Sequence, residues 1–286
     1  MTARVPLGIC LVTALLVDPT PLAAGPPPTA AALPSSRMPG ASPAIQVGEK
    51  LVFSVRYGIL RAGQGSLEIT GVEDVEGHPC YHVVSRARSS STFDRIYRVR
   101  DIVQSWMDRD FLVSRRFART LREGRFCADD FVACDPERRR ATYPDGSVYE
   151  IPAGAHDILS AFYYVRTLRL SPGSEFWLDT HSFRKNYPVK VLVHRRERIE
   201  VPAGVFDCLV IEPMFRVPAL FKHEGRLLIW LTDDERRMPV QMKSKVKIGS
   251  ITAVLTSFER GDIAPVEEPP AGSGPSRGEA SPGAWK

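Results

Sequence analysis

Residues 225–258, GRLLIWLTDDERRMPVQMKSKVKIGSITAVLTSF, determine the fold class of this chain, because they have the pattern of three strands joined by short turns. Three segments within them alternate between apolar and polar residues or are rich in β-branched and aromatic residues, as strands are. These segments are Arg226–Thr232, Pro239–Ile248 and Ser250–Phe258. Gly249 marks the second turn. The stretch therefore predicts an antiparallel meander.

The middle segment of this meander has two different faces. Side chains alternate between the two faces of a strand, so every second residue shares a face. One face carries Lys243, Lys245 and Lys247. The other face carries Met242, Ser244, Val246 and Ile248. We expect the lysine face to contact water and the opposite face to pack against the core.

The first turn of the meander places Asp233 and Asp234 beside Arg236 and Arg237. Aspartate favours turns because its side chain accepts hydrogen bonds from the nearby backbone. The two carboxylates are therefore interpreted first as turn residues. A functional acidic site at Asp233 and Asp234 is the alternative.

Working outward, the rest of the chain is also rich in strand patterns. Predicted strands include Leu51–Tyr57, Ser66–Val72, Cys80–Arg88, Asp94–Trp106, Phe176–Phe183 and Pro188–His194. The sequence therefore predicts an all-β, mainly antiparallel protein. We expect a strongly curved sheet, either an open barrel or a sandwich, with one helix packed on it.

That helix is predicted at Asp157–Leu168. Asp157 is a good N-cap, and Pro172 with Gly173 follows the segment. Its apolar residues recur at helical spacing, which indicates one buried stripe. The predicted stripe is Ile158, Ala161, Phe162 and Val165.

The N-terminal residues 1–24 have the pattern of an export signal. Arg4 precedes an apolar run over residues 5–17, and Ala23 and Ala24 resemble a cleavage site. The run is too short to span a bilayer, which takes about 20 apolar residues. We therefore expect a periplasmic or secreted protein that is not transmembrane once the signal is removed.

Composition also sets the expected domain borders. Residues 25–45 are rich in Pro and Ala and residues 261–286 in Pro and Gly, so we expect a disordered linker and a disordered tail. The predicted single β-rich domain covers residues 46–260. Nucleic acid is not expected as a partner, because export separates the protein from it.

Four cysteines follow the predicted signal, and an oxidising compartment permits disulfides. Cys127 and Cys134 are close in sequence, while Cys80 and Cys208 lie in strand-like segments. These two pairs are the predicted disulfides, with buried free thiols as the alternative.

Three segments resemble the bacterial exported family of unknown function DUF3108. They are HDILSAFYYVR at residues 156–166, RERIEVPAGVF at 196–206, and IWLTDD at 229–234 followed by Met238, Pro239 and Val240. The resemblance spans about residues 47–258. It implies an exported β-rich domain without an established activity, so no catalytic role is carried over.

No catalytic or metal-binding motif is present in the sequence. It has no G-x-S-x-G elbow, no dinucleotide glycine fingerprint, no C-x₂-C and no H-E-x-x-H. The sequence therefore assigns no catalytic residue, no metal ligand and no cofactor. A hydrolase acting on an envelope polymer is kept as an alternative, with Asp157, Asp233 or Asp234 as candidate carboxylates.

Binding functions fit the composition better than catalysis. A curled sheet around one helix offers an apolar concave surface for a lipid or another apolar ligand. The candidate ligand-binding residues are Ile158, Phe162, Val165 and Trp230. A structural or protein-interaction module of the periplasm, binding another envelope protein, is the alternative hypothesis.

A further hypothesis is binding of anionic polymers or lipid headgroups. The chain has a formal net charge of +5 and a pI near 9.0, which favours anionic partners. Five arginines lie within residues 111–125, namely Arg115, Arg116, Arg119, Arg122 and Arg125. Nearby carboxylates, including Asp108, Asp129 and Asp130, are expected to offset part of that charge.

Overall fold

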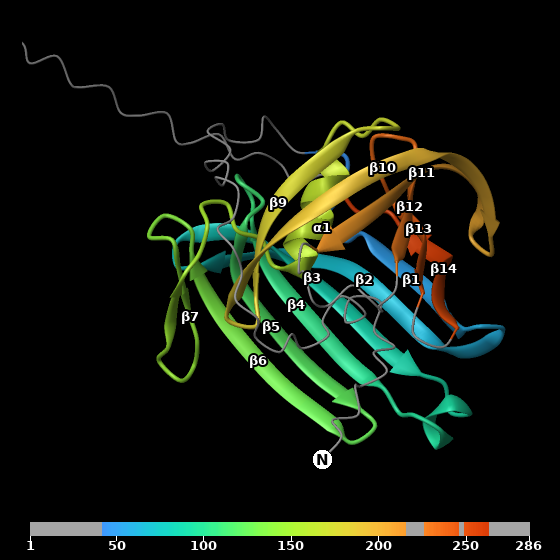
Figure 1. Ribbon diagram of the computed structural model, residues 1–286, viewed down its shortest axis with the longest axis horizontal. Helices are drawn as coiled ribbons and strands as arrows, with labels where there is room; N and C mark the ends of the chain where they lie inside the picture. The colour runs from blue at the N-terminus through green and yellow to red at the C-terminus, as the bar shows by residue number, and fades with distance from the viewer. Residues whose placement is uncertain (1–41, 216–225, 246–248, 263–286) are drawn as a thin grey trace, which may run out of the picture.

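The computed structural model is a 14-stranded antiparallel sheet that curls around one α-helix (Figure 1). The structure describes residues 42–215, 226–245 and 249–262. The predicted all-β class, with a curved open sheet and one packed helix, is confirmed.

The elements in chain order are β1 (Lys50–Tyr57), β2 (Leu60–Val75), β3 (His78–Ser89), the short 3₁₀ helix η2 (Phe93–Arg95), β4 (Arg100–Asp108), β5 (Ser114–Glu123), β6 (Phe126–Asp135), β7 (Arg140–Thr142), β8 (Val148–Glu150), α1 (Ile158–Thr167), β9 (Glu175–Ser182), β10 (Lys185–Val201), β11 (Gly204–Phe215), β12 (Leu227–Thr232), β13 (Pro239–Lys245) and β14 (Ser250–Glu259).

The sheet consists of two meanders joined by one long-range pairing. The chain enters in the middle of the sheet at β1 and continues strand by strand to the edge strand β8. The helix α1 then leads to the opposite edge, where β9 begins the second meander. That meander ends at β14, which pairs with β1 from Lys50↔Glu259 to Tyr57↔Ile251. The first and last strands therefore hold the two halves together.

The predicted C-terminal meander is confirmed within the described residues. β12 pairs with β13 and β13 with β14, both antiparallel. In β13, Lys243 and Lys245 are exposed while Met242 and Ser244 are buried, as the two-residue period requires. The predicted face residues at 246–248 lie outside the described residues.

The prediction of one strand over Asp94–Trp106 is wrong in its first half. Asp94 belongs to η2, and β4 begins only at Arg100. The Asp94 carboxylate accepts a hydrogen bond from the Ser89 hydroxyl and pairs with Arg100 at 2.7 Å. These contacts fold the segment back against the end of β3, a long-range effect that the alternating pattern does not contain.

The helix α1 begins as predicted. Asp157 is the N-cap, and its Oδ1 accepts hydrogen bonds from the backbone N–H groups of Leu159 and Ser160 at 2.8 and 3.0 Å. The Ser160 hydroxyl in turn accepts from the Asp157 N–H at 2.9 Å. This reciprocal capping box satisfies N–H groups that have no partner within the helix.

The buried face of α1 differs from the predicted stripe. Leu159, Tyr163 and Arg166 are almost completely buried, at spacings of four and three residues. Of the predicted stripe, Ala161 and Val165 are buried, whereas Ile158 and Phe162 are only half-buried. The difference arises because α1 is covered on several sides inside the curled sheet, so a charged residue can occupy its most buried position.

The two edges of the sheet meet through side chains. Arg184, in the β9–β10 turn, donates hydrogen bonds to Asp145 and Ser147 of the β7–β8 turn at 2.8 and 2.7 Å. Its backbone N–H donates to the Tyr143 hydroxyl at 2.9 Å, and its guanidinium lies over the Tyr143 ring at 4.6 Å. We name these contacts the edge seam.

The backbone of the edge seam is strained. Phe183 and Arg184 both have positive φ angles, of 49° and 62°, a conformation that costs non-glycine residues energy. The turn thereby places Arg184 on Tyr143 and puts the Phe183 ring under the Arg119 guanidinium at 3.9 Å. The two strained residues are therefore the ones whose side chains contact the opposite edge region of the sheet.

The packed core extends beyond the predicted start of the domain. Ala44 and Ile45 are fully buried, although the predicted linker covers residues 25–45. Asp262 pairs with Val47 in an isolated bridge. The predicted signal and almost all of the predicted linker and tail lie outside the described residues. Within the described ranges, no helix is long and apolar enough to cross a membrane.

The predicted disulfides are not formed, because Cys80, Cys127, Cys134 and Cys208 are all free thiols. Cys127 and Cys134 lie on the same strand β6, seven residues apart, which separates their Cα atoms by roughly 23 Å. A disulfide requires about 7 Å or less. Cys80 and Cys208 lie on β3 and β11, which are not neighbours in the sheet.

Candidate functional site

The acidic turn between β12 and β13 is held by its own hydrogen bonds. Asp234 Oδ1 accepts from the Thr232 hydroxyl at 2.6 Å and from the backbone N–H groups of Arg236 and Arg237 at 3.1 Å each. Asp233 pairs with Arg196 at 2.7 Å and with Arg237 at 2.9 Å. Both carboxylates therefore have the geometry of turn residues.

The ionisation of the two carboxylates agrees with that geometry. The hydrogen bond from Arg196 holds the pKa of Asp233 below its usual value. Burial opposes ionisation of Asp234, but hydrogen bonding from Thr232 and the positive charge of Arg236 outweigh it, so its pKa is also lowered. Neither group has the raised pKa of a general acid.

The four candidate ligand-binding residues lie in or against the core. Val165 and Trp230 are buried, while Ile158 and Phe162 are half-buried and pack against the same core cluster. The Trp230 Nε1 has no hydrogen-bond partner among the described residues. Binding of a ligand by these four residues stays a prediction.

Asp157, a candidate carboxylate of the hydrolase alternative, has a structural role. Its Oδ1 caps α1, and its Oδ2 accepts a hydrogen bond from the buried Ser105 hydroxyl at 2.6 Å. Burial raises the pKa of Asp157. Burial also lowers the pKa of the adjacent His156 to about 4. The carboxylate thus serves as a helix cap beside a histidine that stays neutral at pH 7.

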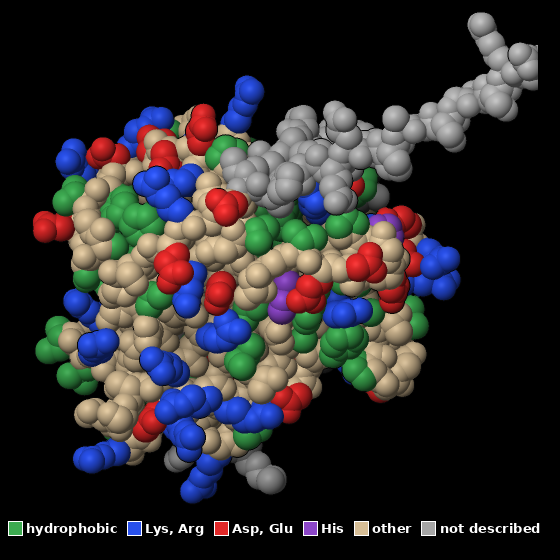
Figure 2. Space-filling model, turned by 180° about the vertical axis from the view of Figure 1, so that it is seen from behind, with side chains coloured by type: hydrophobic (Ala, Val, Ile, Leu, Met, Phe, Trp, Pro, Cys, Tyr) green, Lys and Arg blue, Asp and Glu red, His purple; other side chains and the backbone are tan. Residues whose placement is uncertain are grey.

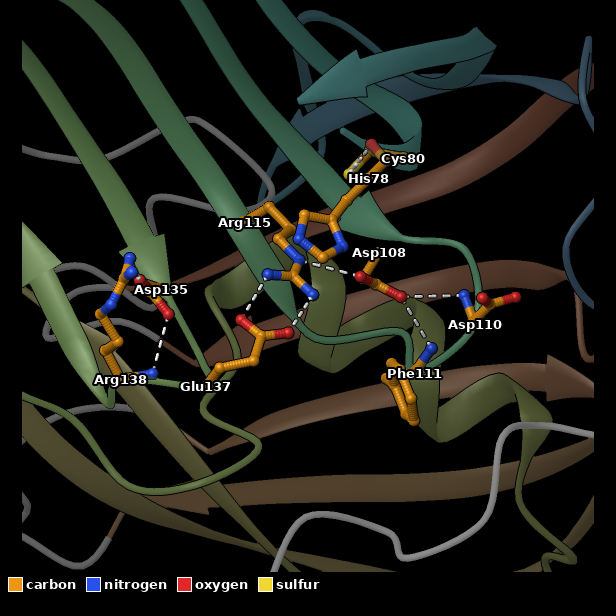
Figure 3. A network of polar contacts seen from close by, with 9 residues as sticks. All are labelled: His78, Cys80, Asp108, Asp110, Phe111, Arg115, Asp135, Glu137 and Arg138. Atoms are coloured by element: carbon orange, nitrogen blue, oxygen red, sulfur yellow. Dashed lines mark hydrogen bonds and ion pairs between the residues drawn. The ribbon is translucent and has the colours of Figure 1, made fainter. Parts of the chain in front are cut away.

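Figure 3 shows a polar network centred on the buried Arg115 of β5. Arg115 donates to Asp108 at 2.8 Å and forms a two-point contact with Glu137 at 2.7 and 2.6 Å. Asp108 Oδ1 also accepts the N–H groups of Asp110 and Phe111, both at 2.9 Å. The network therefore ties the β4–β5 turn to the β6–β7 turn.

The cysteine beside this network is not activated. Burial, reinforced by the charge of Asp108, raises the pKa of the Cys80 thiol to about 12. Burial likewise raises the pKa values of Cys134 and Cys208 to about 12. A nucleophilic cysteine needs a lowered pKa, so none of these three has that character.

Carboxylates offset part of the positive charge of the arginine-rich strand β5, as predicted. Arg119 pairs with Asp130, and Arg122 pairs with Asp129 at 2.9 Å. Together with the Arg115 network, these pairs occupy three of the five arginines of residues 111–125. β5 therefore offers little free charge to an anionic ligand.

Positive charge without a partner among the described residues lies instead beside the β1–β2 turn. Arg56 and Arg61 are opposite each other in the β1–β2 ladder, and both are exposed. Neither has an ion pair or side-chain hydrogen bond within the part of the chain that the structure describes. Two adjacent cations without partners are electrostatically unfavourable in the absence of an anion.

Two open hollows meet at Arg61, and we name them together the basic groove. One, of about 450 Å³, is lined by Ser54, Arg56, Ile59, Arg61, Pro202 and Thr256. The other, of about 650 Å³, is lined by Arg61, Gly63, Gln64, Arg88, Ser89, Ser90, Ser91, Thr92, Asp94 and Arg100. The lining therefore combines four arginines with one carboxylate, and that carboxylate already pairs with Arg100. Figure 2 shows Lys and Arg crowded over the lower part of the face it presents, with few acidic side chains among them.

The strand register assembles the groove. Gln64 of β2 is opposite Arg88 of β3, and Arg88 is opposite Arg100 of β4. Arg88 donates to the Gln64 side chain at 2.8 Å, which orients its guanidinium. A Cβ at Gly63 would meet the Arg88 carbonyl oxygen at 2.1 Å, so glycine is needed where these strands approach closely. The arginines come from separate strands, which is why their clustering is not visible as a sequence motif.

The described residues form no preorganised metal-binding site. No group of three or more His, Cys, Asp and Glu side chains lies close enough there to hold an ion. The chemical capacity of the basic groove is recognition of a negatively charged group by guanidinium and hydroxyl donors.

Comparison with known proteins identifies the family. The model of the family described as protein of unknown function (DUF3108) matches residues 52–256. The chain belongs to this family. The resemblance inferred from three short segments is thus confirmed, and the DUF3108 region runs from β1 into β14. No curated protein matches the chain.

Solved structures of other proteins resemble this DUF3108 chain to different degrees. A beta-barrel-like protein of domain of unknown function DUF1849 from Brucella abortus has a TM-score of 0.55 at 10% identity, covering 77% of this chain and 100% of that chain. A putative lipoprotein from Parabacteroides distasonis has a TM-score of 0.37 at 12% identity, covering 78% and 100%. A putative exported protein with a YmcC-like fold from Bacteroides fragilis has a TM-score of 0.32 at 15% identity, covering 77% and 100%. Only the first structure has a TM-score high enough to support a conclusion. At 10% identity that conclusion concerns the fold alone.

Proposed function

We propose that this protein is an exported, non-catalytic binding protein of the cell envelope that holds phosphate-bearing molecules in the basic groove. The observation that carries the proposal is the pair Arg56 and Arg61, two exposed and adjacent guanidiniums without a partner in the described residues. An arginine presents a planar set of donors that matches phosphate oxygens. A phosphate group would relieve the repulsion between the two cations.

The surroundings of this arginine pair favour an anion as well. Arg88 extends the positive charge across the second hollow, and the segment from Ser90 to Thr92 adds hydroxyl donors. Donors of these kinds recognise phosphate whether it is free or part of a lipid headgroup.

An envelope location rests on the export-signal pattern of residues 1–24. Lipids with phosphate headgroups are abundant at that location, so a lipid-like ligand is retained from the initial hypotheses. The structure favours recognition of its headgroup over its acyl chains, because α1 and the core residues occupy the described interior. The non-catalytic character is favoured by Asp157, Asp233 and Asp234, all of which are engaged in caps, turns and ion pairs.

Calorimetric titration with two soluble probes tests the proposal. The probes are inorganic pyrophosphate and dihexanoyl phosphatidylglycerol below its micelle-forming concentration. We expect Arg56→Gln and Arg61→Gln each to weaken binding about tenfold, because a hydrogen bond to a charged group contributes about 1.5–3 kcal/mol. Binding should also weaken as salt increases. Preference for one probe distinguishes a lipid headgroup from free phosphate.

Arg198→Gln is the matched control. Arg198 is exposed and makes only a 3.8 Å contact with Asp207 on β11, so the variant changes the net charge equally but not the groove. We expect its affinity for both probes to equal that of the unsubstituted protein. Equally weakened probe binding in all three variants would show that net charge alone causes the effect, and would refute a groove site. Failure of the unsubstituted protein to bind both probes would refute it as well.

A further inference from the structure

The turn between β1 and β2 exposes apolar side chains directly beside the basic groove. Ile59 is 96% exposed and Leu60 is 58% exposed. Single exposed apolar residues are ordinary on protein surfaces, but two adjacent branched ones at a hairpin tip are a contiguous apolar protrusion. Gly58, with a φ of 57°, allows the tight reversal that presents them.

Cations flank this protrusion on both strands. Arg56 precedes the turn and Arg61 follows it, and the two are opposite each other in the ladder. An apolar tip with guanidiniums immediately behind it matches the cross-section of a membrane surface, where phosphates lie above the acyl chains. Because the arginines are positively charged, the turn should bind anionic membrane surfaces in preference to neutral ones.

A further exposed apolar side chain lies at the same end of the sheet. Ile96 is 76% exposed in the connection between β3 and β4, and the exposed Arg95 and Arg98 stand on either side of it. The connection is attached to β2, because the Ser90 N–H donates to the Ala62 carbonyl oxygen at 2.8 Å. Figure 1 shows the β1–β2 turn and η2 at the same end of the molecule. Exposed apolar side chains between cations thus occur twice at this end.

We propose that the tip of the β1–β2 turn, Ile59 and Leu60, inserts into the headgroup region of an anionic phospholipid bilayer while Arg56 and Arg61 contact its phosphates. This inference rests on the proposed function, since it takes phosphate as the group that the arginines bind. A bilayer is favoured over a protein partner because the apolar residues protrude. A deformable surface accommodates a protrusion, whereas a rigid partner needs a matching cavity.

Vesicle co-sedimentation with the full chain tests the inference. Vesicles of equal parts phosphatidylglycerol and phosphatidylcholine are compared with vesicles of phosphatidylcholine alone. We expect binding to the anionic vesicles only. The double variant Ile59→Ser/Leu60→Ser should lose about tenfold or more in vesicle affinity, because two apolar side chains no longer enter the bilayer.

Two controls separate insertion from other effects. Val148→Ser removes an exposed apolar side chain on β8, at 54% exposure, and should leave vesicle binding unchanged. The Ile59→Ser/Leu60→Ser variant should bind soluble dihexanoyl phosphatidylglycerol as tightly as the unsubstituted protein, because the groove is intact. Every variant carries the same N-terminal residues, so a difference between variants reports on the turn.

Failure of this inference is distinguishable from failure of the proposed function. Undiminished vesicle binding by the Ile59→Ser/Leu60→Ser variant overturns insertion, as does equal binding of the unsubstituted protein to both vesicle types. Absence of vesicle binding with the soluble probe still bound also overturns insertion but leaves the groove. Both sites are supported together if the Arg56→Gln/Arg61→Gln variant loses the soluble probe while the Ile59→Ser/Leu60→Ser variant keeps the soluble probe but loses vesicle binding.

Discussion

Arg166 of α1 forms a two-point ion pair with Glu49, at 2.7 and 2.8 Å, and both side chains are buried. Glu49 immediately precedes β1, which pairs with the C-terminal strand β14. Arg166 also donates to the backbone carbonyl oxygen of Arg236 at 3.1 Å, in the acidic turn. One guanidinium thus connects the helix to the start of β1 and to the β12–β13 turn.

We predict that Arg166→Met lowers the free energy of unfolding by about 3–5 kcal/mol, because it leaves the Glu49 carboxylate buried without a partner. The double variant Glu49→Met/Arg166→Met should recover most of this loss, since apolar pairs replace buried ion pairs at little cost. Urea unfolding followed by circular dichroism measures both values. A single-variant cost below about 1 kcal/mol would show that the pair is unimportant.

The edge seam should control local opening of the sheet. Arg184→Ala removes the hydrogen bonds to Asp145 and Ser147, and because that pair is exposed we expect only a small loss of global stability. Hydrogen exchange should nevertheless accelerate in β8 and β9 and stay unchanged in β12–β14. Arg86→Ala, which removes an exposed pair between β3 and Glu68 of β2, away from both sheet edges, is the control. Uniform acceleration over all strands would contradict a local seam.

The buried Asp101 should make stability depend on pH. Burial raises the pKa of Asp101, which lies in hydrogen-bonding contact with the buried Glu123 carboxyl group. A carboxyl group with a raised pKa in the folded state contributes stability below its unfolded pKa, near 4, and loses it as pH rises through the folded value. Asp101→Asn keeps a donor toward Glu123 but does not ionise. We therefore expect the variant to gain stability relative to the unsubstituted protein as pH rises above about 4.

Asp145→Asn is the control with the opposite sign. The Ser147 hydroxyl and then Arg184 lower the pKa of Asp145 to about 2, so its contribution is present above pH 4 and is lost as pH falls toward 2. Urea unfolding at a series of pH values measures both differences. An Asp101→Asn difference that is independent of pH would mean that Asp101 does not titrate in this range.

The four described cysteines should differ in reactivity. Cys127 is exposed, whereas burial raises the pKa values of Cys80, Cys134 and Cys208 to about 12. Alkylation of the native protein at pH 8 should therefore label Cys127 first, because the thiolate is the reactive form. Peptide mass spectrometry identifies the labelled residue. Two cysteines that react only after reduction would instead reveal a disulfide.

Local patterns predicted the elements that depend on residues near one another. The alternation of Lys243 and Ser244 follows from the two-residue period of any strand. Asp157 caps α1 through N–H groups only two and three residues away. These features require no knowledge of the strand order, which is why the meander, the helix and the all-β class were predicted correctly. The turn character of Asp233 and Asp234 is local in the same way, since most of their partners lie within a few residues.

Pairing across the sheet lies beyond such patterns. Arg166 occupies the most buried face of α1 because Glu49, 117 residues away, neutralises it. The basic groove exists because the sheet register sets Arg61 of β2 beside Arg56 of β1, and Arg88 of β3 beside Arg100 of β4. Cys127 and Cys134 remain apart because both lie along one extended strand. Burial, charge pairing and distance are properties of strand order and register, and these are set by contacts summed over the whole chain.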